Sequence, residues 1–492
     1  MPKIVQKKIN PYNLVIFGAK GNLSKKKLYP AIYQLEKMHL IHPKTKIIGV
    51  GRANWNSNFY REIFFVAIKK KIKNFLEFSV WNRLREKLIF CNLDIEETKN
   101  FKKLKEIIEL NSFITISYFA TPPETFSNIC YGLAKFKMNK KENRIILEKP
   151  FGTDYSSVKK TNEKILRYFQ EEQIYRIDHY LGKETVLNLF PLRFYNSFFY
   201  FNWNNISIDH IQITLAEKIG IEKRWNYFDR IGQMKDMFQS HMLQILTMIS
   251  MKKPNSMNVF SIRKEKVKIL KSLKKMDIKN ARNLISLGQY SSGYIDKKRV
   301  LGYLQEANAN QKSQTETFFA AKIEIENSNW FGVPFYLRTG KRMPKKCSKI
   351  VLYFRNPFKF LKQKNKFFEQ NKITIRLQPD EGVDIDIFSK IPNLEKNNFY
   401  KKVKLNANFN RIFKTKKYCS NSYEKLLLEV MKGNQSLFVG REEMEESWKW
   451  IDSLSEVISK KEKFLQTYPS GTWGPKSSFK ILKKDKRYWN NS

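Results

Sequence analysis

The chain has 492 residues, of which 42% are hydrophobic and 14% aromatic, so it is long enough for about two to four domains with sizeable cores. This composition excludes an intrinsically disordered protein, and no run approaches the roughly 18 apolar residues that a membrane-spanning helix needs. The net charge of +46 at pH 7 raises nucleic acid as a partner.

The basic excess consists mainly of lysine, since the sequence has 72 Lys and 20 Arg, with the Lys spread along its whole length. Arg is the residue suited to bidentate contacts with bases and phosphates, and no RNP motif, zinc finger or isolated basic arm occurs. Because charge runs are usually solvated faces, we interpret the lysines as surface residues. We expect neither nucleic acid nor a membrane as a partner.

The amino terminus, MPKIVQKKIN, is basic but lacks the apolar segment and the cleavage site of a signal peptide. The cysteines are scattered and form neither a CxxC pair nor a disulfide framework; they are Cys91, Cys130, Cys347 and Cys419. Both observations favour the cytoplasm, and no metal site is expected.

Short apolar runs alternate with helical stretches over the first 180 residues. The runs, rich in β-branched and aromatic residues, lie at 13–19, 46–51, 87–93, 113–120 and 143–149. Helices are expected between them, for example at 24–38 and 98–110. Strand–helix alternation predicts an α/β, Rossmann-like domain with a doubly wound parallel sheet buried on both faces.

The pattern changes after about residue 200. Strands with a more open alternation are expected at 206–217, 318–327 and 372–379, and helices at 232–251, 422–433 and 441–459. This predicts a larger C-terminal α+β domain built on a mainly antiparallel sheet with helices. We place the domains at 1–178 and 179–492, with a loop insertion at 357–372.

A glycine-containing turn, GAKGNLSKKKLYP, follows the first predicted strand. It has Gly18 and Gly21, with Ser24 where the dinucleotide fingerprint has a third small residue. Such a turn lets the backbone approach a pyrophosphate at a helix N-terminus, although a plain strand-to-helix turn would use the same two glycines. Its position after the first strand favours a nucleotide site.

The second predicted strand is followed by Arg52 and by no carboxylate. NAD enzymes place an acid there for the ribose 2′-hydroxyl, whereas NADP enzymes use Arg, so we predict NADP. After the fifth strand comes EKPFG, whose Lys149 stands at the carboxyl end of the sheet, where ligands bind in such folds. A lysine exposed before a proline turn is the alternative interpretation.

Two histidines stand near carboxylates. The segment RIDHYLGKE (176–184) contains Asp178 and His179, and the helical segment QMKDMFQSHMLQILTMI contains Asp236 and His241. In an α-helix five steps separate Asp236 from His241 by about 140°, so the two need not be partners. A histidine on a helix is more often a satisfied core residue than a catalytic one.

The other histidines are interpreted as structural: His210 on a predicted strand, and His39 and His42 in a loop. The segment GVPFYLRTGKRMPKK gathers basic residues around Gly340, namely Arg338, Lys341, Arg342, Lys345 and Lys346. Such a loop suits a phosphorylated or carboxylated ligand, although surface charge explains it equally well in so lysine-rich a chain.

Taken together and in order, these segments resemble bacterial glucose-6-phosphate dehydrogenase. The resemblance covers some 470 residues and also includes YFATPPETF, QITLAEKIGIEKRWNYFD, IRKEKVKILKSL, TETFFA, IRLQPDEGVDI, YEKLLLEVMKGNQSLFV and GTWGP. It implies oxidation of glucose 6-phosphate at C1 to 6-phosphogluconolactone with NADP⁺ as hydride acceptor, the first step of the oxidative pentose phosphate pathway. It also implies a homodimer or homotetramer in the cytoplasm, with the active site between the two domains.

The resemblance assigns roles to individual residues. His241 matches the family's general base and Asp178 the carboxylate that pairs with it. The substrate-binding positions are Lys149, His179, Tyr180, Lys183, Glu217, Asp236, Lys341 and Lys346, of which His179, Tyr180 and Lys183 hold the phosphate. The cofactor-binding positions are Gly18, Ala19, Gly21, Asn22, Leu23, Arg52 and Lys149.

The chain departs from the family pattern at Asn22, where Asp is usual, at Ser240, where Asn is usual, and at Lys223 and Asn226, where glycines are usual. Because none of these changes removes a catalytic group, we expect slower or weaker function rather than its loss. Two alternatives stay open: a sugar oxidoreductase of another Rossmann family with a Glu-Lys-Pro motif, and a basic nucleic-acid-binding protein without catalysis.

Overall fold

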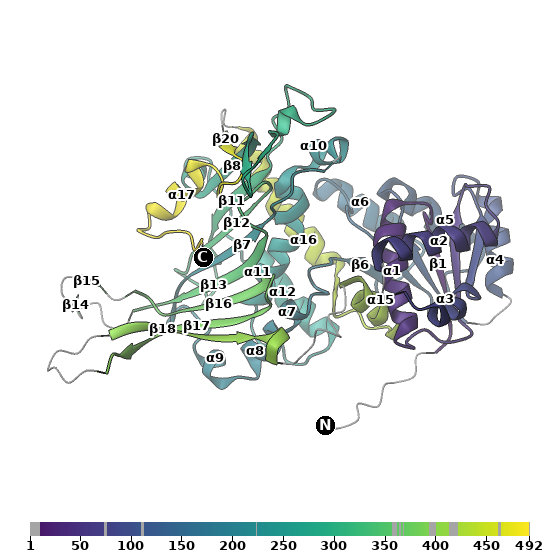
Figure 1. The fold of residues 1–492 in the computed structure, drawn as a ribbon, viewed down its shortest axis with the longest axis horizontal. Helices are drawn as coiled ribbons and strands as arrows, with labels where there is room; N and C mark the ends of the chain where they lie inside the picture. Colours follow the sequence, from purple (N-terminus) through teal and green to yellow (C-terminus); the bar gives the residue numbers. More distant parts are fainter. Residues whose placement is uncertain are drawn as a thin grey trace. The chain divides into compact units, whose positions relative to one another are not determined.

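The chain forms two compact units in the computed structural model (Figure 1). The first unit comprises 1–183, 256–263 and 420–445, and the second comprises 184–255, 264–419 and 446–492. The sequence prediction placed one boundary after residue 178 and did not include the two later segments, 256–263 and 420–445, that belong to the first unit. The structure describes residues 10–72, 76–109, 113–222, 224–356, 362–363, 366–367, 369–392, 400–412, 422–460 and 464–491.

The first unit is built on a seven-stranded sheet in the order β19-β6-β5-β4-β1-β2-β3. Six strands are parallel: β1 (Tyr12–Phe17), β2 (Lys46–Gly51), β3 (Leu88–Asn92), β4 (Ile114–Phe119), β5 (Arg144–Leu147) and β6 (Ile174–Ile177). The edge strand β19 (Phe438–Val439) is antiparallel to β6. Strand order reverses between β1 and β4, so the ligand crevice of such a sheet is expected at their carboxyl ends.

The strands of this sheet are almost continuously buried, because helices pack against it. They include α1 (Tyr29–Lys37), α2 (Ser57–Ile72), α4 (Phe101–Glu109), α5 (Phe126–Lys135) and α6 (Tyr155–Leu166). One large core joins side chains of β1, β2, β4 and β5 to apolar residues of α4 and α5. The predicted Rossmann-like parallel sheet is confirmed.

The second unit is built on a nine-stranded sheet in the order β18-β17-β16-β13-β7-β12-β11-β8-β20. Its strands are β7 (Ile208–Ala216), β8 (Ile285–Ser291), β11 (Phe318–Ile323), β12 (Phe335–Gly340), β13 (Cys347–Phe354), β16 (Lys372–Gln378), β17 (Gly382–Lys390), β18 (Tyr400–Asn408) and β20 (Leu465–Pro469). Two neighbouring pairs, β7 with β12 and β8 with β20, are parallel, and the remaining pairs are antiparallel. The predicted mainly antiparallel sheet is confirmed.

The helix predicted at 232–251 consists of three segments. The end of α10 (Trp225–Gln233) leads into the π-helical η6 (Met234–Met242), which continues as α11 (Leu243–Ser250). Every residue of α11 is buried. This layer carries two of the predicted site residues into the interior of the second unit.

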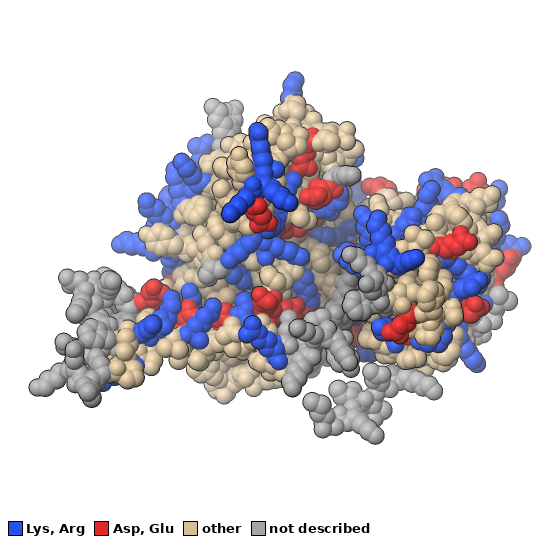
Figure 2. All heavy atoms as spheres, in the orientation of Figure 1, with Lys and Arg blue, Asp and Glu red and all other residues tan. Residues whose placement is uncertain are grey.

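Several predictions fall on residues that the structure does not describe. Lys223 and Cys419 lie outside the described residues, as does half of the predicted loop 357–372, within which β14 (Lys362–Gln363) pairs with β15 (Lys366–Phe367). The other three cysteines are buried free thiols. Among the described helices none is long and apolar enough to cross a membrane. Figure 2 shows Lys and Arg spread over the visible face with Asp and Glu among them.

Candidate active site

The turn after β1 is tight because its backbone is bonded at both ends. The amide of Gly18 donates to the carbonyl of Val50 at 3.1 Å, and that of Gly21 donates to the carbonyl of Gly18 at 2.9 Å. Gly18 has φ +84°, and a Cβ there would come within 2.4 Å of the Ala120 carbonyl oxygen at the end of β4. Only glycine fits this position without strain. Ser24 is buried and its hydroxyl donates to Gly18 O at 3.0 Å, which closes the turn.

A cavity of about 500 Å³ opens at the carboxyl ends of β1, β2 and β4, where the strand order reverses. Its lining includes Phe17, Gly18, Lys20, Gly51, Arg52, Asp94, Glu96, Thr121 and Pro122. Ala19 and Gly21 belong to the turn beside it, and Asn22 and Leu23 begin the helical segment that follows. Two of its acids are already engaged, because Asp94 accepts from the Glu96 amide at 3.1 Å and Glu96 accepts from Asn128 at 2.9 Å. Arg52 and Lys20, both exposed, are the cations in the cavity wall that could face an anionic group.

Lys149 follows β5 next to a glutamate in an unusual setting. The Tyr118 hydroxyl, on β4, donates to Glu148 at 2.5 Å, and Tyr423 of α15 (Ser422–Lys432) also hydrogen-bonds to it. Burial raises the pKa of Glu148 to about 7, although the two tyrosines and the Lys149 charge act in the opposite direction. The negative charges of Glu148 and Asp178 both raise the pKa of Tyr423 beyond the effect of its burial.

The DHYLGK segment forms two consecutive turns after β6. The Tyr180 amide donates to Asp178 Oδ1 at 2.9 Å, and the Leu181 and Lys183 amides donate to the carbonyls of Asp178 and Tyr180. Lys183 Nζ lies 3.3 Å from the centroid of the Tyr180 ring, and the ring centroids of His179 and Tyr180 are 5.1 Å apart. The fold thus gathers a carboxylate, an imidazole, a phenol and an ammonium group within six residues.

Asp236 and His241 both lie buried on η6. The predicted separation of about 140° assumed an α-helix and is wrong, because the Leu243 amide reaches back to Phe238 O, the i to i−5 spacing of a π-helix. Residues five apart therefore come much closer to alignment than in an α-helix. Ser240, at the departure before the histidine, donates from its hydroxyl to Asp236 O at 2.8 Å and stays within the helix.

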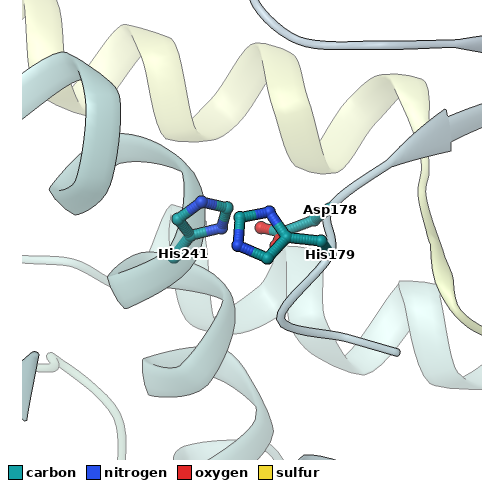
Figure 3. A group of neighbouring side chains, drawn as sticks. All are labelled: Asp178, His179 and His241. Carbon is teal, nitrogen blue, oxygen red and sulfur yellow. The ribbon is translucent and has the colours of Figure 1, made fainter. Parts of the chain in front are cut away.

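Figure 3 shows the elements from which the three central side chains come: Asp178 and His179 follow strand β6, and His241 projects from η6. In the second unit, β7 and β12 end side by side and bring two more predicted residues together. Lys341 Nζ lies 2.6 Å from Glu217 Oε2, and Lys341 is 1% exposed. Lys346 is exposed and instead lines a cavity of about 1160 Å³ with Lys345, Arg376 and Lys404.

The histidine on β7 has a different environment. His210 is buried, bonded to Asp209 at 2.7 Å and stacked on Tyr353 with ring centroids 4.2 Å apart. Burial lowers its pKa despite the neighbouring Asp209 carboxylate. These contacts agree with a structural role, and the loop residue His39 adopts a left-handed backbone with φ +55°.

Two family models match the chain. The model described as "Glucose-6-phosphate dehydrogenase, NAD binding domain" matches residues 15–188, and "Glucose-6-phosphate dehydrogenase, C-terminal domain" matches residues 190–490. With the Rossmann-like sheet and the cavity at its switch point, these matches define a nicotinamide-dependent oxidoreductase. The chain belongs to the glucose-6-phosphate dehydrogenase family.

Relatives agree with this assignment over the full length. The chain is 49% identical to the glucose-6-phosphate 1-dehydrogenase of Dickeya dadantii over 97% of both chains. It is also 49% identical to that of Buchnera aphidicola subsp. Baizongia pistaciae, over 99% of this chain and 100% of the relative. A solved glucose-6-phosphate dehydrogenase in complex with glucose 6-phosphate matches with a TM-score of 0.89 and 30% identity, over 99% of this chain and all of the other.

Sequence reasoning gave no role to several residues that contact the predicted site. Glu148 precedes Lys149 and is hydrogen-bonded by Tyr423, and Glu316 contacts the start of η6. All three stand in segments that carry the family resemblance, EKPFG, YEKLLLEV and TETFFA. Their positions in these motifs could have indicated that these three residues matter. The motifs did not indicate which side chains or backbone groups Glu148, Tyr423 and Glu316 contact.

Proposed function

We propose that the chain oxidises glucose 6-phosphate at C1 to 6-phosphogluconolactone, with NADP⁺ as the hydride acceptor and with the residues of this site in the roles that the resemblance assigns. The reaction is that of the family to which the chain belongs. The observation that supports the assignment of residues is that the predicted acids, bases and cations stand near the ends of strands, in the turns after β6 or on η6.

His241 acts as the general base that takes the proton of the C1 hydroxyl. As this proton leaves, electron density on the oxygen helps the hydride depart from C1, so the base must lie beside the carbon that is oxidised. Asp178 orients His241 and stabilises the imidazolium that forms. The hydrogen bond from the Tyr180 amide fixes one Asp178 oxygen and so fixes the direction of the carboxylate.

The other end of the sugar is held by His179, Tyr180 and Lys183. A phosphate dianion suits an ammonium, a phenol and an imidazole, because hydrogen bonds to ionised groups are roughly twice as strong as neutral ones. The contact of Lys183 with the Tyr180 ring restrains the lysine before substrate arrives. Binding energy from the phosphate, remote from C1, thereby supports orientation at the reacting carbon.

The remaining residues bind the sugar between these ends. Glu217 and Asp236 accept hydrogen bonds from sugar hydroxyls, and Lys341 and Lys346 lie at the far side of the substrate. Lys149 contacts both substrate and cofactor. The ion pair of Lys341 with Glu217 keeps both groups ordered at the ends of β7 and β12.

NADP⁺ fits the turn and cavity after β1. The Gly18 conformation and the open face of the turn suit a pyrophosphate, and Arg52 in the cavity wall suits the 2′-phosphate. When bound, the nicotinamide supplies the hydride acceptor. The enzyme is proposed to work in the cytoplasm as a homodimer or homotetramer. Light scattering of the purified protein would measure its oligomeric state.

The direct test is steady-state kinetics with glucose 6-phosphate, two other hexose phosphates and each nicotinamide cofactor. We expect reduced cofactor to form fastest with glucose 6-phosphate and NADP⁺. Replacing Arg52 by Leu should raise the KM for NADP⁺ by roughly tenfold to a hundredfold and leave the KM for NAD⁺ nearly unchanged, as expected for loss of a charged hydrogen bond. Equal use of both cofactors by the wild type would contradict the role of Arg52.

The role of His241 is tested separately. His241→Asn should lower kcat by at least about a hundredfold, because a positioned base contributes about 10²–10⁴ to such a rate. Intact activity in this variant would overturn the mechanism. A folded wild type without any dehydrogenase activity, but with tight, salt-sensitive DNA binding, would favour the nucleic-acid alternative instead.

A further inference from the structure

The junction between α10 and η6 is bonded to a single glutamate. Glu316 Oε1 accepts from the Met234 amide at 2.9 Å, and the Glu316 carbonyl accepts from the Gln233 amide at 3.0 Å. Amides at the start of a helical segment lack partners within it and need an acceptor from elsewhere. Glu316 provides two such acceptors, immediately before the segment that carries Asp236 and His241.

The same carboxylate is packed against a kink in the backbone. Gly232 has φ +71° and ψ 173°, which interrupts the helix one residue before the junction. A Cβ at Gly232 would come within 2.4 Å of Glu316 Oε1, so the two groups are in close contact. The kink therefore depends on glycine at 232 and on the place of the Glu316 carboxyl group.

The segment around Glu316, which precedes β11, is itself anchored on both sides. Thr315 donates from its hydroxyl to the Asp229 carbonyl at 2.6 Å, and Ser313 bonds to the Asp229 carboxylate. On the other side the Lys341 amide donates to Thr317 O at 2.9 Å. Residues 313–317 thus connect α10 directly to the end of β12, where Lys341 pairs with Glu217.

We propose that Glu316 is a positioning residue of the reaction: it fixes the start of η6 so that Asp236 and His241 take their working places relative to Lys341. This proposal rests on the roles proposed above for those three residues. The side chain of Glu316 bonds to the backbone amide of Met234 and not to the side chains of Asp236, His241 or Lys341. Its influence on these residues therefore passes through the backbone of residues 232–236.

The Glu316 carboxyl group can accept the hydrogen bond from the Met234 amide whether it is ionised or protonated. Burial raises the pKa of Glu316 to about 7, while hydrogen bonds from the amides of Met234 and of Glu316 itself, and the charge of Lys235, act to lower it. Both the protonated and the ionised carboxyl group keep an oxygen that can accept from Met234. A glutamine at this position would keep such an oxygen as well.

The test compares Glu316→Gln with Glu316→Ala, using Glu326→Ala as the control because Glu326 is exposed on the segment after β11. We expect Glu316→Ala to lower kcat with glucose 6-phosphate by about tenfold, the cost of one lost capping bond to a buried amide. The KM for NADP⁺ should change less than twofold, since the cofactor turn lies in the other unit. Glu316→Gln should stay within about threefold of the wild-type kcat.

Hydrogen exchange of the ligand-free proteins provides a readout that does not depend on activity. Amides of residues 234–242 should exchange at least about tenfold faster in Glu316→Ala than in the wild type, and near the wild-type rate in Glu316→Gln. Should Glu316→Ala fail to fold, Glu316→Asp takes its place, because it keeps a carboxyl group but shortens its reach to the Met234 amide and should produce the same local change.

The proposal would be overturned if Glu316→Gln were as impaired as Glu316→Ala, or if faster exchange were spread evenly over the protein rather than confined to 234–242. Unchanged kcat in Glu316→Ala would do the same. If instead the wild type itself failed to oxidise glucose 6-phosphate, the proposed function would fail, while the exchange experiment would still report on the junction.

Discussion

At the scale of single residues, we assign one short segment to both ends of the substrate. Asp178 has one oxygen bound by the Tyr180 amide, and the side chains of Tyr180 and Lys183 contact each other in the turns that follow. The aspartate is thus held by the same backbone that presents the phosphate ligands. We assign the obvious histidine of the motif, His179, to the phosphate, and propose as the base His241, a histidine 62 residues later in the sequence.

The first prediction separates the two neighbours. Asp178→Asn should lower kcat by about a hundredfold or more with a small change in KM, because an amide neither orients nor stabilises an imidazolium as a carboxylate does. His179→Asn should raise the KM for glucose 6-phosphate by about tenfold or more, with a smaller effect on kcat. His39→Asn is the control, since His39 is exposed and asparagine tolerates its left-handed backbone. Similar kinetics for both variants would contradict this division of roles.

The second prediction concerns Glu148, whose pKa is raised from 4.5 to about 7 by burial. The folded protein then holds a proton that the unfolded chain releases above its ordinary carboxyl pKa. Stability from this group is therefore fully present below about pH 4.5 and is lost as pH rises to about 7. Glu148→Gln should remove this slope, so that its free energy of unfolding falls less than that of the wild type between pH 5 and 7.

Urea denaturation across that pH range measures the effect, with Glu142→Gln as the control because Glu142 is an exposed residue near the start of β5. The control should follow the wild type at every pH. Parallel curves for the wild type and Glu148→Gln would show that Glu148 does not titrate differently in the folded state. The experiment needs no substrate and therefore does not depend on the catalytic assignment.

At the scale of elements, the sequence predicted those parts that hydrophobic pattern determines. The expected strand at 46–51 coincides with β2 (Lys46–Gly51), and the helix expected at 441–459 coincides with α16 (Arg441–Ser459). These elements repeat apolar residues at the spacing of their own geometry, and that spacing is visible in one sequence. Ends defined by such patterns shifted by one or two residues elsewhere, as at β1 and β7.

The π-helical geometry of η6 could not be predicted in this way. Its sequence, MKDMFQSHM, has the apolar content of an ordinary helix, and one extra residue per hydrogen-bonded turn leaves no compositional trace. The acceptor beside the kink at Gly232 is Glu316, which lies 82 residues beyond Met234 in the sequence. The catalytic residues were thus found by resemblance, and their relative direction required the structure.

At the scale of the whole molecule, the large positive charge does not form one block. Figure 2 shows basic side chains across the visible face with acidic ones among them. Ion pairs inside the first unit also use buried basic residues, such as Arg176 with Glu171 at 2.7 Å and Lys87 with Glu36 at 3.0 Å. A positive surface nevertheless raises the local concentration of anionic ligands such as a sugar phosphate, an effect that salt screens.

The division of the chain into units leads to the last prediction, because the first unit is completed by a late segment. β19 covers the edge of β6, the Tyr12 hydroxyl contacts Met431 Sδ at 3.1 Å, and Arg144 donates to the carbonyls of Val430 and Met431. A fragment of residues 1–188, which contains the stretch 15–188 that matches the NAD-binding family model, lacks all of these contacts. Its β6 edge and several buried polar groups would then be exposed.

We therefore expect fragment 1–188 to aggregate or to unfold without a cooperative transition. Joining residues 1–183 to residues 422–445 by a flexible linker of about six Gly and Ser residues should restore cooperative urea unfolding and NADP⁺ binding by titration calorimetry. The short linker suffices because a Cβ on Gly182 would lie 3.0 Å from Ser422 O. A matched fusion with the order of residues 422–445 scrambled is the control. Equal stability of fragment 1–188 and the fusion would show that the late segment is dispensable for folding of the first unit.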